Sequence, residues 1–297
     1  MAKLLARVAP WLPSARQSAG GVEFRTLGGK DTSQLWDLVN SDSTANVFMA
    51  AHLEASGTAA PSSSGGEVIG AFHDSRMASA CWTGVNLVPI GMTGDDAAAL
   101  GALLGESGRR FSSIFGPATS VLGLWSTLRT FSPEPFDVRA EQPLLEIRHA
   151  SPVPPAATLR HTEPHELEQI LPACAAMFEE EVGYSPYVGG GEHYRRRVAS
   201  LIRRRHSLVD FDGDGRVIFK AELGTVSAST AQIQGVWVNP DYRGQGLAAG
   251  YMSAVVNEAL KLAPVASLYV NSFNTRALAL YRTVGFVRAG EFATVLF

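Results

Sequence analysis

The sequence predicts an α/β fold of the α+β type, in which two consecutive domains each build a mixed sheet with helices packed on it. The order strand, two helices, strands, helix, strand, helix, strand fits residues 22–149 and recurs in residues 158–297. Between these ranges, residues 150–157 are proline-rich, which favours a stiff, extended linker. At 297 residues the chain is long enough for two domains of about 100–200 residues each.

The first half opens with an apolar–polar alternation at Val22–Leu27, which indicates a strand. Asp31 stands before a helical run and is a suitable N-cap. The Gly/Ser-rich residues 56–66 are expected to form a flexible loop. The other expected elements are strands at 67–73, 77–87, 112–115 and 141–148 and helices at 31–40, 46–55, 95–110 and 118–130.

Residues 1–21 form a segment of their own, with Lys3, Arg7 and Arg16 but no acidic residue. A targeting peptide has a similar composition, yet Arg7 interrupts the apolar core that a secretory signal needs. We therefore expect a flexible leader rather than a signal.

The second half repeats the element order from Thr158 onward. The expected helices cover 164–182, 192–206, a run that starts at 247 and a run that starts at 274. The expected strands cover 158–160, 207–211, 217–223, 231–238 and 267–271, and a hairpin is expected over 286–297.

Composition narrows the function classes. The formal net charge of −3 gives no general case for nucleic-acid binding, and no apolar run approaches the roughly 20 residues that span a bilayer. The two cysteines, Cys81 and Cys174, lie one in each half, which argues against a disulfide framework and fits a reducing, cytoplasmic setting. His161 and His165 are separated by Pro164, so no metal site is expected.

A glycine-rich turn joins a strand ending at Val238 to a helix starting at Leu247. Such a turn leaves several backbone N–H groups without intrahelical partners, and the helix dipole adds positive potential at the same point. Gly244, Gly246 and Ala248 are small enough to let an anion approach the backbone. The turn is therefore expected to bind a phosphate or pyrophosphate. The alternative is an ordinary strand–turn–helix connection.

A second motif follows downstream. Asn274, Ala277 and Tyr281 are spaced i, i+3 and i+7, so they share one face of a helix that Gly285 ends. Asn274 is equally a good N-cap residue, and Tyr281 could be a core tyrosine.

Together these motifs resemble the GNAT superfamily of N-acetyltransferases. The pattern Arg243-x-x-Gly246-x-Ala248 resembles its acetyl-CoA pyrophosphate loop, and the Asn274 to Phe286 segment resembles its second cofactor-contacting helix. The resemblance covers about residues 158–297, with its specific part at 234–286. It implies tandem GNAT-like acyl-CoA N-acyltransferase domains. In the first half, residues 86–94 lack the loop pattern, so that domain is expected to be a degenerate copy.

The resemblance also implies roles for single residues. Acetyl-CoA would be the acetyl donor, and Tyr281 would protonate the leaving thiolate. The residues expected to bind the cofactor are Val236, Trp237, Val238, Arg243, Gly244, Gln245, Gly246, Leu247, Ala248 and Asn274. Backbone N–H groups of Val236–Val238 would hold the pantetheine arm where the sheet splays.

The general base is less well defined by the sequence. Gln232 and Gln234 occupy the expected strand positions, but an amide does not take a proton at neutral pH. The nearest carboxylate in the sheet is Glu222, which shares a strand face with Lys220. Glu222 is therefore the candidate catalytic base, acting through water, and a plain Lys–Glu pair is the alternative.

The acceptor is expected to be a primary amine, with a cationic amine and a peptide amine among the candidates. Glu179, Glu180 and Glu181 precede a Gly- and Tyr-rich stretch that suggests a mobile lid over the acceptor site, although a solvated helix end fits as well. The arginine triplets 195–197 and 203–205 favour a solvated basic face over a site for an acidic partner.

We thus expect an N-acetyltransferase that works by direct attack of the amine, since neither cysteine has a recognisable nucleophile setting. The alternative is a non-catalytic acyl-CoA sensor or regulatory module, which the absence of a carboxylate at residues 232 and 234 would favour.

Overall fold

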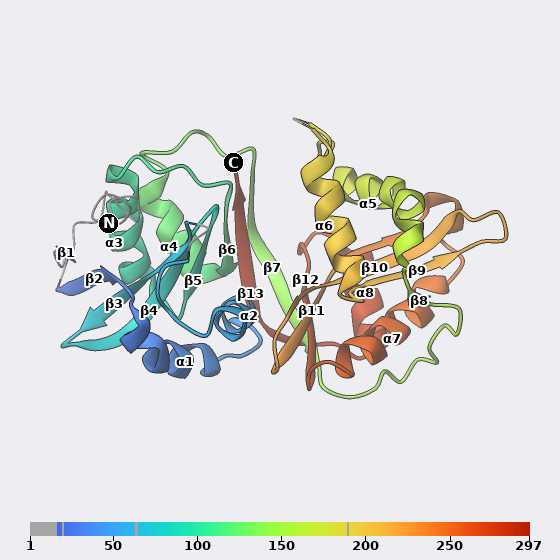
Figure 1. Cartoon of the computed structure of the whole chain (residues 1–297), viewed down its shortest axis with the longest axis horizontal. Helices are drawn as coiled ribbons and strands as arrows, with labels where there is room; N and C mark the ends of the chain where they lie inside the picture. The colour runs from blue at the N-terminus through green and yellow to red at the C-terminus, as the bar shows by residue number, and fades with distance from the viewer. Residues whose placement is uncertain (1–16, 20, 63–64, 189) are drawn as a thin grey trace. The chain divides into compact units, whose positions relative to one another are not determined.

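The computed structural model describes residues 17–19, 21–62, 65–188 and 190–297 (Figure 1). The chain divides into two compact units. The first unit holds residues 1–144, 269–273 and 289–297, and the second holds residues 145–268 and 274–288.

The first unit follows the predicted order closely. Its strands are β1 (Gln17–Ala19), β2 (Val22–Thr26), β3 (Glu67–His73), β4 (Arg76–Thr83), β5 (Asn86–Ile90), β6 (Ser113–Pro117) and β7 (Asp137–Ile147), the last of which runs on into the second unit. Its helices are α1 (Thr32–Asn40), α2 (Val47–Ser56), α3 (Gly94–Glu106) and α4 (Ala118–Leu128). A short 3-10 turn, η2 (Gly29–Asp31), leads into α1.

Two predicted elements of this unit differ from the structure. The single strand expected over 77–87 is two antiparallel strands, β4 and β5, because residues Gly84 and Val85 turn the chain between them. Of the expected leader, residues 17–19 form β1, which pairs antiparallel with β2. The rest of the leader up to residue 16 lies outside the described residues.

The C-terminal strand belongs to the first unit. The expected hairpin over 286–297 is instead one strand, β13 (Val287–Leu296), and its residues 292–296 pair antiparallel with β6. The strand order in this unit is β1-β2-β3-β4-β5-β6-β13-β7. The predicted domain ranges 22–149 and 158–297 remain predictions. The last strand, which the predicted range 158–297 includes, belongs to the first compact unit.

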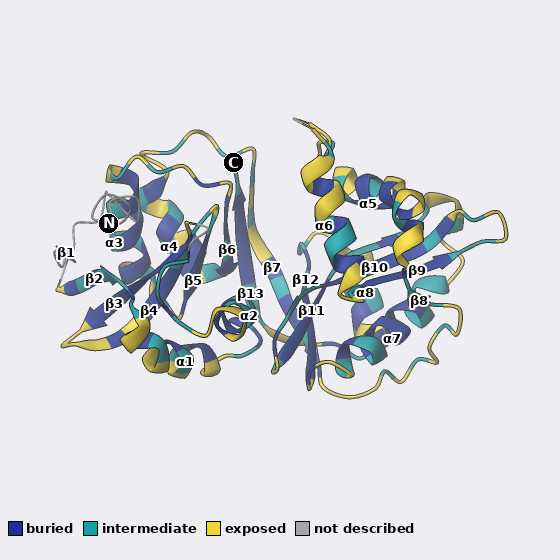
Figure 2. Cartoon of the chain, in the orientation of Figure 1, coloured by how far each residue is buried: buried dark blue, intermediate teal, exposed yellow. Residues whose placement is uncertain are grey.

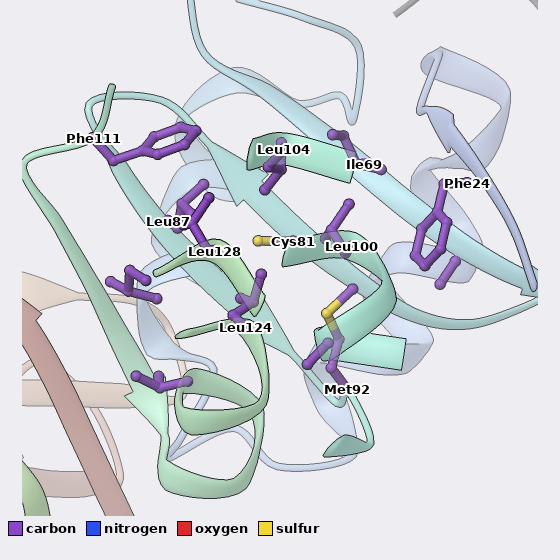
Figure 3. Close-up of a cluster of buried hydrophobic side chains, with 14 of the residues drawn as sticks. Phe24, Ile69, Cys81, Leu87, Met92, Leu100, Leu104, Phe111, Leu124 and Leu128 are labelled. Atoms are coloured by element: carbon purple, nitrogen blue, oxygen red, sulfur yellow. The ribbon is translucent and has the colours of Figure 1, made fainter. Parts of the chain in front are cut away.

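A core between the sheet and helices α3 and α4 explains this placement. Leu100, Leu104, Leu124 and Leu128 pack there around the Cys81 thiol (Figure 3). Ala293 and Val295 of β13, which point to one face of the sheet because they are two residues apart, belong to the same cluster. A second cluster, with Leu35, Met49 and Leu53 among its members, fills the space under α1 and α2. Figure 2 shows the buried strands and the exposed outer face of α1, whereas α2 is exposed only at its C-terminal end.

The second unit carries the remaining elements. They are β8 (Arg160–His161), η3 (Pro164–Glu166), α5 (Leu167–Val182), α6 (Glu192–Arg203), β9 (Ser207–Phe211), β10 (Val217–Val226), β11 (Thr230–Val238), η4 (Pro240–Tyr242), α7 (Leu247–Leu260), β12 (Val265–Tyr269) and α8 (Thr275–Val284). The strand order is β12-β11-β10-β9-β8. β10 and its neighbours pair antiparallel, whereas β11 and β12 are parallel.

Helices cover this sheet through apolar contacts. The buried residues of α5 and α6, including Ile170, Cys174, Val198 and Ile202, form one cluster with residues of β9, β10 and β11. In α7, the consecutive residues Tyr251–Val256 are all buried, so the helix is enclosed on most sides rather than amphipathic. Within the described ranges, no helix is both long enough and apolar enough to span a membrane.

Candidate functional site

The candidate site of the second unit begins where two parallel strands separate. The ladder between β11 and β12 covers only Thr230–Gln232 against Val265–Ser267, whereas β11 continues to Val238 along β10. At the last rung, the buried Ser267 hydroxyl has no hydrogen-bond partner in the described residues. The sheet therefore opens beyond this rung, which is the splay that the resemblance implies.

The backbone of Val238 faces this opening. The Asn239 N–H donates to the Ile218 carbonyl at 2.9 Å. Since hydrogen bonding alternates along an antiparallel pair, the N–H and carbonyl of Val238 point away from β10. A β-bulge lies just before, where the register shifts opposite Lys220 and Glu222 and Gly235 has a φ of +58°. Val238 thus offers a backbone donor on the open side of β11.

The glycine-rich turn has the conformation that an anion-binding turn needs. Asn239 caps the first residues of the turn, because its side-chain oxygen accepts a hydrogen bond from the Asp241 N–H at 3.1 Å. Gly244 has a φ of +78° and Gly246, the N-cap of α7, a φ of +75°, and both are exposed. A Cβ added at either position would meet no protein atom within 4 Å. Positive φ therefore explains the glycines, and the space beside them is open.

The first turn of α7 is electrostatically prepared for an anion. Glycine at its N-cap supplies no side-chain oxygen, and Leu247, Ala248 and Ala249 carry no charge. The N–H groups of this turn have no intrahelical acceptors, and they stand at the positive end of the helix dipole. The arrangement suits a pyrophosphate.

Arg243 lies at this turn but binds within the protein. Its Nε donates to the Val238 carbonyl at 2.9 Å, and its Nη2 donates to both Glu180 oxygens at 3.0 and 2.8 Å. The Trp237 indole N–H donates to the same Glu180 carboxylate at 3.0 Å. Trp237, expected as a cofactor contact, is thus buried and bonded to α5 through its side chain. Glu180 belongs to this arrangement and is not an unengaged acidic residue of a lid.

The second motif also forms as a helix. Asn274 caps α8, since its Oδ1 accepts from the Ala277 N–H at 3.1 Å. Tyr281 is 7% exposed, and its hydroxyl has no hydrogen-bond partner in the part of the chain that the structure describes. Burial, with a smaller contribution from Glu181, raises the pKa of Tyr281. The phenol therefore stays protonated at neutral pH, as a proton donor must.

Glu222, the candidate base, lies in a buried charged cluster. Its carboxylate accepts from Lys220 Nζ at 2.7 Å, from Arg197 Nη2 at 3.1 Å and from Gln234 Nε2 at 3.3 Å. Burial acts to raise the pKa of Glu222, but the two cations outweigh it and hold the pKa below its usual value. A carboxylate with a lowered pKa is a weak base, which favours the alternative reading of a Lys–Glu pair.

The cysteines are unsuited to carry an acyl group. Burial raises the pKa of the Cys81 thiol to about 12, and burial likewise raises the pKa of Cys174. Both remain thiols at neutral pH, and both are buried.

The equivalent place in the first unit is built differently. The β5–β6 ladder covers only Asn86–Leu87 against Ser113–Ile114, so these strands also separate. Pro89 then has no N–H to offer, and a Cβ on Gly116 would lie 3.6 Å from Pro89. The N-terminus of α3 is capped by the Thr93 hydroxyl, which accepts from the Asp96 N–H at 3.2 Å. Acidic residues in its first turn would repel an anion.

Sequence reasoning missed two residues of the site. Arg197 was interpreted as part of a solvated basic face, which fits the exposed Arg195 and Arg196 but is wrong for Arg197. The helical spacing could have indicated this, because Arg197 follows the buried Tyr194 by three residues and precedes the buried Leu201 by four, which places it on the same face of α6. The bridging position of Glu180 depends on tertiary packing, for which the sequence has no signal.

Comparisons with known proteins agree with this geometry. Residues 175–286 match the family model described as the acetyltransferase (GNAT) family, and residues 66–170 match one described as a domain of unknown function, DUF4081. No curated protein sequence matches the chain.

Solved structures with the same fold span nearly the whole chain. A GCN5-related N-acetyltransferase from Sphaerobacter thermophilus has a TM-score of 0.56 at 18% identity, with 94% of this chain and 96% of that one covered. A GNAT-family acetyltransferase from Colwellia psychrerythraea has a TM-score of 0.56 at 12% identity, covering 92% and 99%. A tandem GNAT protein from the clavulanic acid biosynthesis pathway has a TM-score of 0.50 at 14% identity, covering 92% and 98%.

Proposed function

We propose that this chain, whose residues 175–286 form a domain of the GNAT acetyltransferase family, transfers the acetyl group of acetyl-CoA to a primary amine. The family match and the solved relatives support an acyltransferase, with a tandem GNAT fold. Our proposal extends this acyltransferase assignment by naming acetyl-CoA as the donor and a primary amine as the acceptor. The observation that carries them is the uncapped glycine turn at Gly246, beside the opening between β11 and β12.

The proposed donor site uses backbone groups. The pyrophosphate would lie on the N–H groups of residues 244–248, and the pantetheine arm would follow the open side of β11 and bond to the Val238 N–H. Arg243 and Asn274 would flank the two ends of the donor. When bound, acetyl-CoA supplies the thioester that the amine attacks.

The proposed reaction is a direct transfer. A neutral amine attacks the thioester carbonyl, and the strand opening holds the two reactants side by side. As the C–N bond forms and the C–S bond breaks, Tyr281, which burial keeps protonated by raising its pKa, gives its proton to the leaving thiolate, and the proton that the attacking nitrogen loses returns through water to the phenolate. The two cysteines take no part. The amine enters as the free base, because Glu222 is already bonded to two cations.

Because Glu222 is bonded to two cations and is a weak base, a second function is also supported, that of a non-catalytic acyl-CoA sensor. A module that binds acyl-CoA and reports on it would need the glycine turn but no base. The two functions differ in one measurement, which is the release of free thiol from acetyl-CoA across a panel of amines.

The test uses the full chain. Isothermal titration with acetyl-CoA should give saturable binding, and the amine panel should give thiol release above the rate without amine. Binding without any thiol release would support the sensor, and no binding would overturn both.

A further inference from the structure

A charged cluster between β10 and α6 of the second unit holds an unbalanced charge. Lys220 and Glu222 of β10 are 0% and 1% exposed at their side chains, and Arg197 of α6 is 39% exposed. Burial acts to lower the pKa of Lys220, but the bonded Glu222 carboxylate holds that pKa above its usual value, so Lys220 stays charged. Two cations therefore share one carboxylate, and the cluster carries an excess positive charge.

This cluster adjoins the proposed path of the donor. A Cβ added to Gly235, in the bulge of β11, would lie 3.2 Å from Lys220 Nζ and 3.2 Å from the Glu222 carboxyl carbon. Gln234 of the same strand donates to the Glu222 oxygen that Arg197 also contacts. The cluster thus lies against the stretch of β11 that leads to Val238.

Arg197 is the exposed end of the cluster. Glu222 is its only hydrogen-bond partner among the residues described, and that bond uses Nη2. A guanidinium carries five N–H donors in a planar fork that matches a carboxylate or phosphate. Donors on Nε and Nη1 therefore remain available at a half-exposed position.

The α5–α6 connection lies over the same place. Tyr187 packs edge-on against Tyr194 with ring centroids 6.0 Å apart, and the Tyr194 hydroxyl donates to the Cys174 carbonyl at 2.8 Å. Tyr194 precedes Arg197 by three residues, so the two share a face of α6. Arg197 consequently lies on the face of α6 that is turned to the sheet, where it contacts Glu222, while Arg195 and Arg196 face outward to Glu168 and Glu192.

We propose that the amine acceptor carries an anionic group, a carboxylate or a phosphate, close to its amine, and that Arg197 binds this group. The proposal rests on the proposed acetyl transfer, whose acceptor it narrows. Lys220 holds the Glu222 carboxylate, which in turn holds the Arg197 guanidinium, and the excess charge of the cluster is neutralised when the acceptor binds. The class is that of amino acids and similar zwitterionic or acidic metabolites, in place of the cationic amine that was one of the expected acceptors.

The test compares amines that differ in a single group. Lysine with cadaverine, arginine with agmatine, histidine with histamine and tyrosine with tyramine are pairs in which the second member lacks only the carboxylate. Amines with a phosphate, such as phosphoethanolamine against ethanolamine, cover the other anion. Each is assayed by thiol release from acetyl-CoA, and its binding to the full chain with CoA present is followed by thermal shift.

We expect the anionic member to be favoured in at least one pair by about 10- to 100-fold in kcat/KM, the scale of a charge-assisted hydrogen bond. Arg197→Gln should remove this preference while the KM for acetyl-CoA stays unchanged. Arg196→Gln lies one position away on the same helix, where Arg196 contacts the Glu192 carboxylate at 3.8 Å and the Glu192 carbonyl at 3.3 Å, and this variant should keep the preference.

Several results would overturn the proposal. If the amines without an anionic group are turned over as well as or better than their anionic counterparts, the anion site is refuted and the proposed acetyl transfer still stands. Equal effects of Arg197→Gln and Arg196→Gln would also refute the anion site. If no amine is turned over, the proposed acetyl transfer is wrong. The thermal-shift measurement then decides whether Arg197 forms an anion site. A shift by an anionic member that Arg197→Gln removes supports an anion site, and no such shift refutes it.

Discussion

Replacing Gly246 with alanine separates the role of its backbone in folding from its role in binding. At a φ of +75°, a residue with a Cβ is strained by roughly 1–2 kcal/mol. The added methyl meets no protein atom within 4 Å, so packing adds nothing to this cost. The methyl would instead occupy the open side of the turn, where we place the pyrophosphate. We expect Gly246→Ala to lower the unfolding free energy by roughly 1–2 kcal/mol and the affinity for acetyl-CoA at least about tenfold.

Gly57 provides a matched control for this substitution. It ends α2 in the first unit with a φ of +68°, and a Cβ there would also meet nothing within 4 Å. Gly57→Ala should lose a similar amount of stability in urea unfolding while isothermal titration gives an unchanged Kd. If Gly246→Ala binds acetyl-CoA as tightly as the unaltered chain, or if both variants weaken binding equally, the assignment of the turn to the pyrophosphate is wrong.

Other predictions test the remaining parts of the account. Tyr281→Phe should lower kcat by a larger factor than it lowers acetyl-CoA affinity, because the hydroxyl acts on the leaving thiolate; equal losses in steady-state kinetics and titration would contradict this. Cys81→Ala and Cys174→Ala should each keep kcat within about twofold, since thiols with raised pKa values form no acyl-enzyme; a large loss in either would refute direct attack. Glu222→Gln should cost about 3–5 kcal/mol in urea unfolding at pH 7, because it leaves buried cations without their partner. The folded pKa of Glu222 lies below its ordinary 4.5, so its stabilisation is present above that pH and is lost as pH falls through the folded pKa; the unaltered chain should therefore lose stability on acidification more steeply than Glu222→Gln, and parallel curves would contradict the lowered pKa.

Local patterns in the sequence predicted most helices, strands and turns, because the backbone conformation of such a segment depends mainly on its own residues. The strand β9 and the strand β3 lie at the predicted residues, and the Gly244 and Gly246 turn has the positive φ values that glycine pairs of this kind permit. The turn at Gly84 was missed because the apolar residues on both sides run together into one strand-like stretch. Short apolar stretches of that kind do not show where one strand stops.

Partner choice could not be read from the sequence in the same way. Phe292, Ala293 and Val295 predict a buried strand, but nothing in their pattern shows that it pairs with β6 of the first unit. The charged cluster has the same limitation. The alternation of Lys220 and Glu222 placed them on one strand face, whereas their burial under α6 and the contribution of Arg197 follow from packing between distant segments.

Calorimetric titration of the full chain with acetyl-CoA shows which of the two similar units binds the donor. The uncapped α7 turn should bind it, and the α3 turn, capped by Thr93 and followed by two aspartates, should not. We expect a stoichiometry of one acetyl-CoA per chain, with that binding weakened by Gly246→Ala. A stoichiometry of two would show that the first unit also holds a donor site, and no binding would contradict the account as a whole.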